Sequence, residues 1–189
     1  MPAIPDGAAP RLPTTKNSAD RVRRRLSQPT QPGVLASTDP VCRLVLGSDA
    51  ALAAAVDSYA QNTWVVGEDP DHIATISTAA GTLSYITVPL TGRYSVSTRG
   101  IFRNPTSATG HVAFVTRGSA SASSSIVRAK QNTGDGAGAD GTIVYGERRL
   151  PLTAGDILYW GHWTGLACTL QAVNFGVPTE IGLYWWGNR

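Results

Sequence analysis

Residues 180–186, close to the C-terminus, are apolar on both faces of any strand that they form. Successive side chains of a strand point to opposite sides of its sheet. Ile181, Leu183 and Trp185 therefore share one face, while Tyr184 and Trp186 share the other. Large aromatic side chains bury roughly 150–250 Å² each, so the first face can line a core while the second needs another covering surface. The sequence predicts a subunit that assembles, with Tyr184 and Trp186 at its interface.

Short apolar segments separated by turn residues dominate the chain after residue 60. Residues 93–102 alternate most clearly, with Tyr94, Val96 and Phe102 on one face and small or charged residues on the other. No long helical pattern separates the segments, and parallel sheets need crossover helices. The sequence therefore predicts an all-β, antiparallel jelly-roll sandwich. Its expected strands are residues 42–46, 83–88, 93–102, 111–117, 124–130, 142–150, 157–163, 166–175 and 180–186.

One segment inside this pattern has a helical composition. Residues 49–59 are rich in alanine and follow Ser48 and Asp49, either of which can act as an N-cap. We expect a short helix there.

The first 40 residues form a separate region. They hold seven of the twelve prolines, and proline is excluded from sheet interiors and from long helices. We expect an extended arm over residues 1–40, with a short helix at 18–27 capped by Ser18. The jelly-roll domain is expected over residues 41–189.

Positive charge is concentrated in the arm. The chain has a net charge of +3; residues 1–45 contribute 7 − 3 = +4 and the remainder 9 − 10 = −1. A body that binds nucleic acid carries clustered positive charge, which this composition does not provide. Arg21, Arg23, Arg24 and Arg25 could neutralise phosphates or dock on an acidic protein surface, and the planar arginine fork favours fixed carboxylates. We therefore expect these arginines to anchor the arm to another protein.

Signatures of catalysis and of cofactor binding are missing from the sequence. It has no phosphate-binding loop, zinc-protease motif, nucleophile elbow or dinucleotide fingerprint, and its three histidines have no partner at metal-ligand spacing. The prediction is a protein without enzymatic activity, cofactor or metal. Asp135 and Asp140 lie in a glycine-rich run, where a hairpin tip is favoured over a calcium loop. Cys42 and Cys168 are interpreted as buried free thiols in preference to a disulfide.

Two tryptophans raise the alternative of glycan binding. Trp160 and Trp163 flank His162, and sugar rings often stack on such aromatic side chains. In a purely structural interpretation, Trp160 lies in the core beside Leu158 and Trp163 covers one end of a sheet. This structural interpretation is favoured over glycan binding.

Two motifs resemble the C1q/TNF-like jelly-roll family. Residues 85–96, Tyr-Ile-Thr-Val-Pro-Leu-Thr-Gly-Arg-Tyr-Ser-Val, are similar to a strand–turn–strand signature of that family. Residues 150–158, Leu-Pro-Leu-Thr-Ala-Gly-Asp-Ile-Leu, are similar to a second one, in which Asp156 is expected to bond the turn backbone. Gln61-Asn-Thr-Trp64 resembles the start of bacteriophage versions of the domain.

The resemblance covers residues 60–186. It implies a homotrimer in which the last strand lies in the inner sheet near a three-fold axis. The sequence lacks a Gly-X-Y stem, and the calcium and receptor residues of animal members have no counterpart, so animal-type signalling is not implied.

A trimer-forming jelly roll with a Pro/Arg-rich arm and no recognisable export signal resembles virion proteins of tailed bacteriophages. The sequence-based hypothesis is a minor tail or tail-tip protein, assembled in the host cytoplasm and anchored to other virion proteins through residues 1–40. Its loops would contact a host-surface glycan. The alternatives are a capsid decoration protein at three-fold positions and a carbohydrate-binding module. No apolar run is long enough to span a membrane, so membrane insertion is not expected.

Overall fold

The computed structural model describes residues 40–60, 64–69, 72–76, 82–103, 110–132, 142–174 and 176–187. The predicted arm up to residue 39 lies outside these described residues, as do its expected helix at 18–27 and the arginines expected to anchor it. The glycine-rich run with Asp135 and Asp140 lies outside them too.

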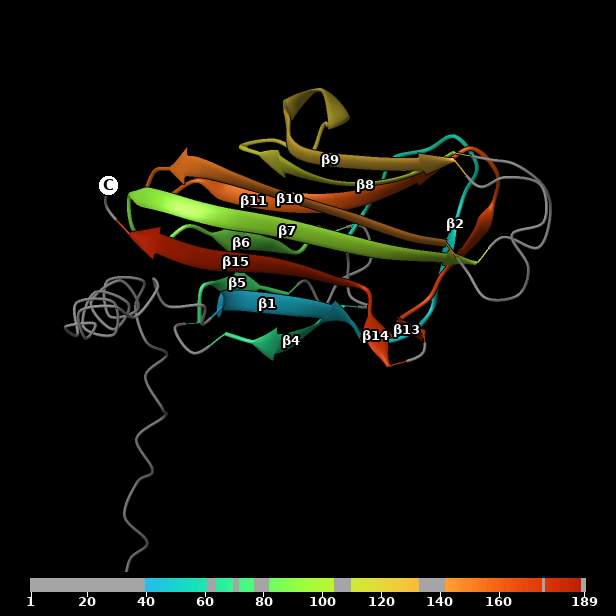
Figure 1. The fold of residues 1–189 in the computed structure, drawn as a ribbon, viewed down its shortest axis with the longest axis horizontal. Helices are drawn as coiled ribbons and strands as arrows, with labels where there is room; N and C mark the ends of the chain where they lie inside the picture. The colour runs from blue at the N-terminus through green and yellow to red at the C-terminus, as the bar shows by residue number, and fades with distance from the viewer. Residues whose placement is uncertain are drawn as a thin grey trace, which may run out of the picture.

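Two β-sheets pack face to face (Figure 1). The larger, called the large sheet below, has the order β2 (Ala50–Leu52), β12 (Cys168–Leu170), β7 (Gly92–Arg103), β15 (Glu180–Gly187), β1 (Pro40–Leu46) and β4 (Trp64–Glu68), with β10 (Thr142–Leu152) also paired to β7. The small sheet has the order β5 (Ala74–Thr75), β6 (Tyr85–Thr87), β11 (Ile157–Thr164), β8 (Gly110–Arg117) and β9 (Ser125–Asn132), with β3 (Ser58–Tyr59) beside β11.

The pairing confirms the predicted antiparallel sandwich. Every strand pair in the described part of the chain is antiparallel, including the two-residue strands β13 (Val173–Asn174) and β14 (Val177–Pro178). Several neighbouring strands are far apart in sequence: β15 lies between β1 and β7, and β11 lies between β6 and β8. These non-local pairings are typical of a jelly roll.

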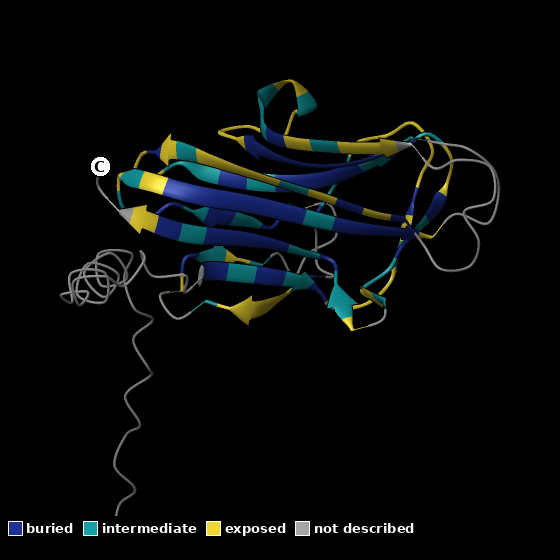
Figure 2. Cartoon of the chain, in the orientation of Figure 1, coloured by how far each residue is buried: buried dark blue, intermediate teal, exposed yellow. Residues whose placement is uncertain are grey.

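The core lies between the two sheets and follows the expected alternation. Tyr94, Val96 and Phe102 of β7 face inward, as do Ile181, Leu183 and Trp185 of β15. From the small sheet, Trp160 packs edge-on against Trp64 with ring centroids 5.4 Å apart. Figure 2 shows the long strands β7 and β15 mostly buried, while β10 and β4 at the sheet edges are largely exposed.

The helix expected over residues 49–59 is wrong. Residues 50–52 form β2, which pairs with β12 in the large sheet, and residues 58–59 form β3, which pairs with β11 in the small sheet. The segment thus crosses from one sheet to the other. Its backbone groups form hydrogen bonds with a strand of each sheet, and these bonds would not form if the segment were a helix. Asp49 does not cap a helix; its side chain accepts a hydrogen bond of 2.8 Å from the backbone N–H of Ala172.

One further expectation about secondary structure, the strand over residues 166–175, is met only in part. The strand predicted over residues 166–175 is divided, because only 168–170 (β12) and 173–174 (β13) are extended and paired. Within the described ranges the only helical element is the short 3-10 turn η1 (Ala122–Ser124), and no helix there is long and apolar enough to cross a membrane.

The two family motifs form adjacent turns that are hydrogen-bonded to each other. Gly155 has a φ of 89°, and the carboxylate of Asp156 accepts a 2.7 Å hydrogen bond from the N–H of Thr153, as expected. In the other motif Gly92 simply begins β7, and the hydroxyl of Tyr94 closes the turn by donating to the carbonyl of Leu90 at 2.7 Å. Bonds between the backbones of Val88 and residues 155 and 156, 2.8–2.9 Å long, join the two turns.

Candidate functional site

The outward-facing side of the large sheet, called the large-sheet face below, gathers the features expected of an interaction surface. Tyr184 and Trp186, predicted to lie there, do point outward from β15, because their neighbours Leu183 and Trp185 are buried in the core. The register places side chains from β1, β4, β7 and β10 on the same side. The face comprises Arg43, Val45, Val65, Glu68, Arg93, Ser95, Ser97, Arg99, Ile143, Tyr145, Glu147, Arg149, Glu180, Tyr184 and Trp186.

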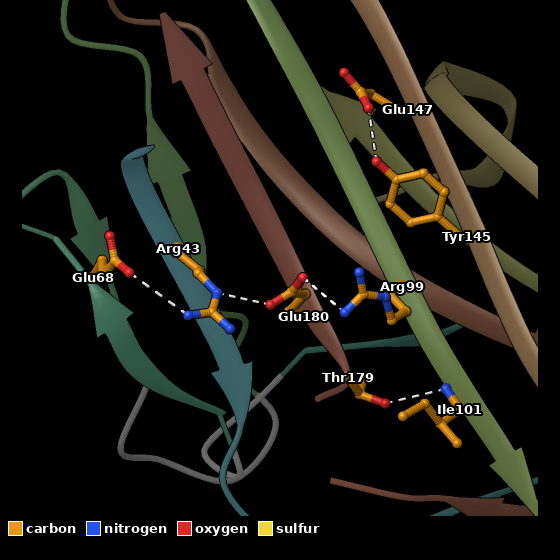
Figure 3. Close-up of polar contacts among 8 residues, drawn as sticks. All are labelled: Arg43, Glu68, Arg99, Ile101, Tyr145, Glu147, Thr179 and Glu180. Carbon is orange, nitrogen blue, oxygen red and sulfur yellow. Dashed lines mark hydrogen bonds and ion pairs between the residues drawn. The ribbon is translucent and has the colours of Figure 1, made fainter. Parts of the chain in front are cut away.

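A network of ion pairs crosses four strands of this face. Glu180 of β15 lies between two arginines, with its carboxylate 2.7 Å from Nε of Arg43 on β1 and 3.0 Å from Nη1 of Arg99 on β7 (Figure 3). Arg43 also lies 3.6 Å from Glu68 on β4. Glu180 is the best shielded of the four, and the hydrogen bond to it raises the pKa of Arg43 further. The network holds four strands in register and presents fixed charges.

Aromatic side chains of the large-sheet face contact arginines on other strands of the sheet. The guanidinium carbon of Arg149 lies 3.6 Å from the centroid of the Trp186 ring, across the intervening strand β7. Arg99 lies 5.6 Å from the ring of Tyr145, and both distances fit cation–π contacts. The ring of Tyr184 lies against Gly182, where a Cβ atom would come within 2.5 Å of it. These contacts orient the aromatic rings along the sheet, so the surface is pre-formed.

A hydrogen-bonded carboxylate completes this surface. Glu147 accepts hydrogen bonds from the hydroxyls of Ser95 and Tyr145, the latter 2.7 Å long (Figure 3). Both bonds favour the ionised carboxylate and hold the pKa of Glu147 below its usual range. Burial, followed by the bond to Glu147, raises the pKa of Tyr145 to about 12. The carboxylate therefore stays charged and the phenol stays neutral at physiological pH.

The composition of the face favours a protein partner. Ile143, Tyr145, Val65 and Trp186 are each more than 40% exposed, which is unusual for large apolar side chains on a monomer. Between them stand charges of both signs that nearly cancel, and most are already paired within the chain. The cores of protein–protein interfaces are typically rich in aromatic residues and arginine, whereas a surface that binds a long polyanion carries mainly positive charge.

Trp160 and Trp163 lie on opposite sides of the small sheet. Trp160 is fully buried between the sheets and offers no ring to a sugar, so its assignment to glycan contact is wrong and its core placement is confirmed. Trp163 is half-buried and points outward, beside Val112. Residues three positions apart in a strand point to opposite faces, so the spacing of Trp160 and Trp163 in the sequence already indicated that they lie on opposite sides of the sheet.

The two cysteines and two of the histidines are buried in the domain. Cys42 and Cys168 are free, buried thiols, as expected, and burial raises the pKa of both. His111 and His162 pack on Phe102 in the core, and burial lowers the pKa of each. Within the described residues no three metal-ligating side chains gather into a site.

Strand β10 contributes residues to the face that the sequence interpretation missed. Ile143, Tyr145, Glu147 and Arg149 alternate along it, and the register with β7 turns all four outward. The alternation was visible in the sequence, but only the pairing of β10 with β7 shows that these residues share a surface with Tyr184 and Trp186.

Comparison with known proteins agrees with this architecture. No family model and no curated protein sequence matches the chain. Among solved structures, Eiger TNF from S. frugiperda is similar with a TM-score of 0.52 at 13% identity, over 80% of this chain and 96% of that one. Murine APRIL is similar with a TM-score of 0.50 at 15% identity, over 76% of this chain and 96% of that one. The fold is a TNF-like jelly roll. At these identities the likeness concerns the fold alone.

Proposed function

We propose that this protein is a structural component of a tailed-bacteriophage virion: a homotrimeric minor tail or tail-tip protein that displays a TNF-like jelly roll. Three copies would associate through the large-sheet face, residues 1–40 would anchor the trimer to other virion proteins, and the small sheet would face outward. The role is structural and not enzymatic. The observation that carries the proposal is the aromatic and charge-paired large-sheet face.

The physical chemistry of that face supports association with copies of itself. Burying an unpaired charge costs several kcal/mol, whereas Arg43 and Arg99 are already paired with Glu68 and Glu180 within one chain. Covering the face therefore mainly removes exposed apolar area, with Trp186 and Tyr145 as the largest contributors. The C1q/TNF-like resemblance implies the same geometry, with the last strand near a three-fold axis.

The composition of the arm supports the anchoring role. Residues 1–40 are rich in proline, and Arg21, Arg23, Arg24 and Arg25 form one short basic cluster. A segment that cannot bury a core of its own can gain order on a partner surface, and arginine forks suit carboxylates there. The Asn-Thr-Trp sequence at residues 62–64, similar to bacteriophage versions of the domain, supports placing the partner in a virion.

The oligomeric state of the full-length chain tests the first half of the proposal. Size-exclusion chromatography with light scattering should give about 60 kDa, three times the chain mass of 19.9 kDa. A monomer at micromolar concentration would refute the assembly role of the large-sheet face.

The location of the protein tests the second half. Particles of the phage that encodes the chain should be purified, separated into heads and tails, and analysed by mass spectrometry. We expect the protein in the tail fraction. Its presence in heads alone would instead favour the decoration role, and its absence from particles would refute a virion function.

A further inference from the structure

A small pocket lies on the outward side of the small sheet, away from the large-sheet face. It has a volume of about 180 Å³ and is lined by Asp57, Val112, Arg128, Lys130 and Trp163. We propose that this pocket binds an acidic sugar, a pyranose that carries a carboxylate, within a cell-surface polysaccharide. The inference deepens the display role proposed above by naming the ligand class, and it does not depend on the trimer.

The strand register builds the pocket as one row across three strands. Trp163 of β11 lies opposite Val112 of β8, and Val112 lies opposite Lys130 of β9. Neighbouring strands are about 4.8 Å apart, so the backbones at Trp163 and Lys130 are separated by roughly 10 Å. Val112 is buried and forms an apolar floor between them. This width and floor suit a single sugar ring lying across β8.

The two sides of the row differ in chemistry. On one side the half-buried indole of Trp163 provides an apolar wall, on which the C–H face of a pyranose can stack. On the other side are two cations, because Arg128 lies two residues before Lys130 on β9 and both are exposed. A ring stacked on Trp163 would direct a carboxylate towards these cations.

The cations of this pocket differ from three other arginines of the domain, which are ion-paired. Arg43, Arg99 and Arg117 each form an ion pair with a carboxylate. Arg128 and Lys130 form no ion pair with any described residue, although a carboxylate, Asp57, lines the same pocket. Their charges are thus available to a ligand, and hydrogen bonds between charged partners are about twice as strong as neutral ones.

Asp57 supplies the third element of recognition. It precedes β3 beside Tyr59, whose pKa is raised by burial and by the negative charge of Asp57. A carboxylate only accepts hydrogen bonds, so Asp57 suits the hydroxyl groups of a sugar. Two cations and one anion leave a net charge of +1, which matches one carboxylate per ring. A neutral sugar would leave both cations without a charged partner.

Lys130 provides a specific reporter for the test, because it is the only lysine after Lys16. Reductive methylation with ¹³C-formaldehyde keeps the charge of the amine and gives Lys130 its own NMR signal. The full-length protein should be titrated with three acidic oligosaccharides, containing glucuronate, galacturonate or sialic acid, and with neutral chito- and cello-oligosaccharides of equal length. At least one acidic oligosaccharide should shift the Lys130 signal saturably and leave that of Lys16 unmoved, while the neutral ones should not.

Variants identify the residues responsible. Trp163→Ala and Arg128→Ala should each weaken binding roughly tenfold, whereas Arg117→Ala, on the same sheet but outside the pocket, should leave it unchanged. Near-ultraviolet circular dichroism checks that each variant is folded. Arg128→Lys, which keeps the charge and the fold, should recover part of the affinity lost in Arg128→Ala.

The proposal is overturned if none of the acidic oligosaccharides shifts Lys130, or if inorganic phosphate shifts it as strongly at equal concentration. The second outcome would mark a simple anion site. A trimer that binds no acidic sugar would remove this inference and leave the assembly role standing. A monomer that binds one would do the reverse.

Discussion

Replacing Trp186 with serine tests the assembly face most directly. The side chain is 42% exposed in the single chain, and a tryptophan presents up to about 250 Å², so about 100 Å² remains to be covered. At about 25 cal/mol per Å² this area is worth roughly 2.5 kcal/mol per subunit, or about 7 kcal/mol for three. Each 1.4 kcal/mol is a factor of ten, so the trimer dissociation constant should rise about 10⁵-fold. Because that constant scales with the square of concentration, the midpoint for dissociation should rise roughly 300-fold.

The single chain should stay folded but should also be less stable. Within one chain Trp186 loses its contact with Arg149, which is worth about 0.5–1 kcal/mol at an exposed site, and the apolar contacts of its covered part, so association and monomer stability must be measured separately. Sedimentation velocity over a dilution series measures the dissociation midpoint. Urea unfolding below that midpoint measures the stability of the monomer. Tyr184→Ser should act in the same direction.

Leu166→Ser is the matched control. Leu166 is also 42% exposed but lies in the turn between β11 and β12, outside the large-sheet face. This variant should leave the midpoint unchanged. If Trp186→Ser lowers the stability of the monomer while association survives, the assignment of the large-sheet face to assembly is refuted.

Three further predictions concern stability and the arm. Burial lowers the pKa of His162 from 6.5 to about 4, so between these pH values the unfolded chain binds more protons than the folded chain. The free energy of unfolding should therefore fall by up to about 3 kcal/mol as the pH is lowered from 6.5 to 4. His162→Gln should flatten this part of the urea-unfolding profile, and an unchanged slope would assign the acid sensitivity to other groups. Glu180→Gln should lower the free energy of unfolding by about 1–2 kcal/mol, because two arginines lose a charged acceptor; calorimetry showing equal stability would contradict a structural role for the network. Deleting residues 1–40 should leave a folded jelly roll that no longer enters particles, and normal incorporation would refute the anchor.

The alternation of side chains along single strands was predictable from the sequence. In β7 and β15 the apolar residues expected inside are inside, and Tyr184 and Trp186 point outward. Side-chain direction in a strand depends only on the local backbone, so a period of two identifies it without knowledge of the partners. The same rule separates Trp160 from Trp163, in agreement with the favoured interpretation of the sequence and against the alternative in which both contact a glycan.

The segment at residues 49–59 was not predictable in this way. Its alanines favour a helix locally, but β2 and β3 pair with residues that lie more than a hundred positions later in the chain. Local propensity differences are a few tenths of a kcal/mol per residue, and tertiary hydrogen bonding at two sheet edges overrides them.

The sequence by itself determined the fold class, the faces of the longest strands and the two turns of the family motifs, because each depends on residues close together in the chain. Only the tertiary structure decided which strands became neighbours. It brought Arg149 to Trp186, Glu180 to Arg43 and Arg99, and Lys130 to the row of Trp163. Strand order in a jelly roll is set by pairings across long loops, and such pairings leave no period in the sequence.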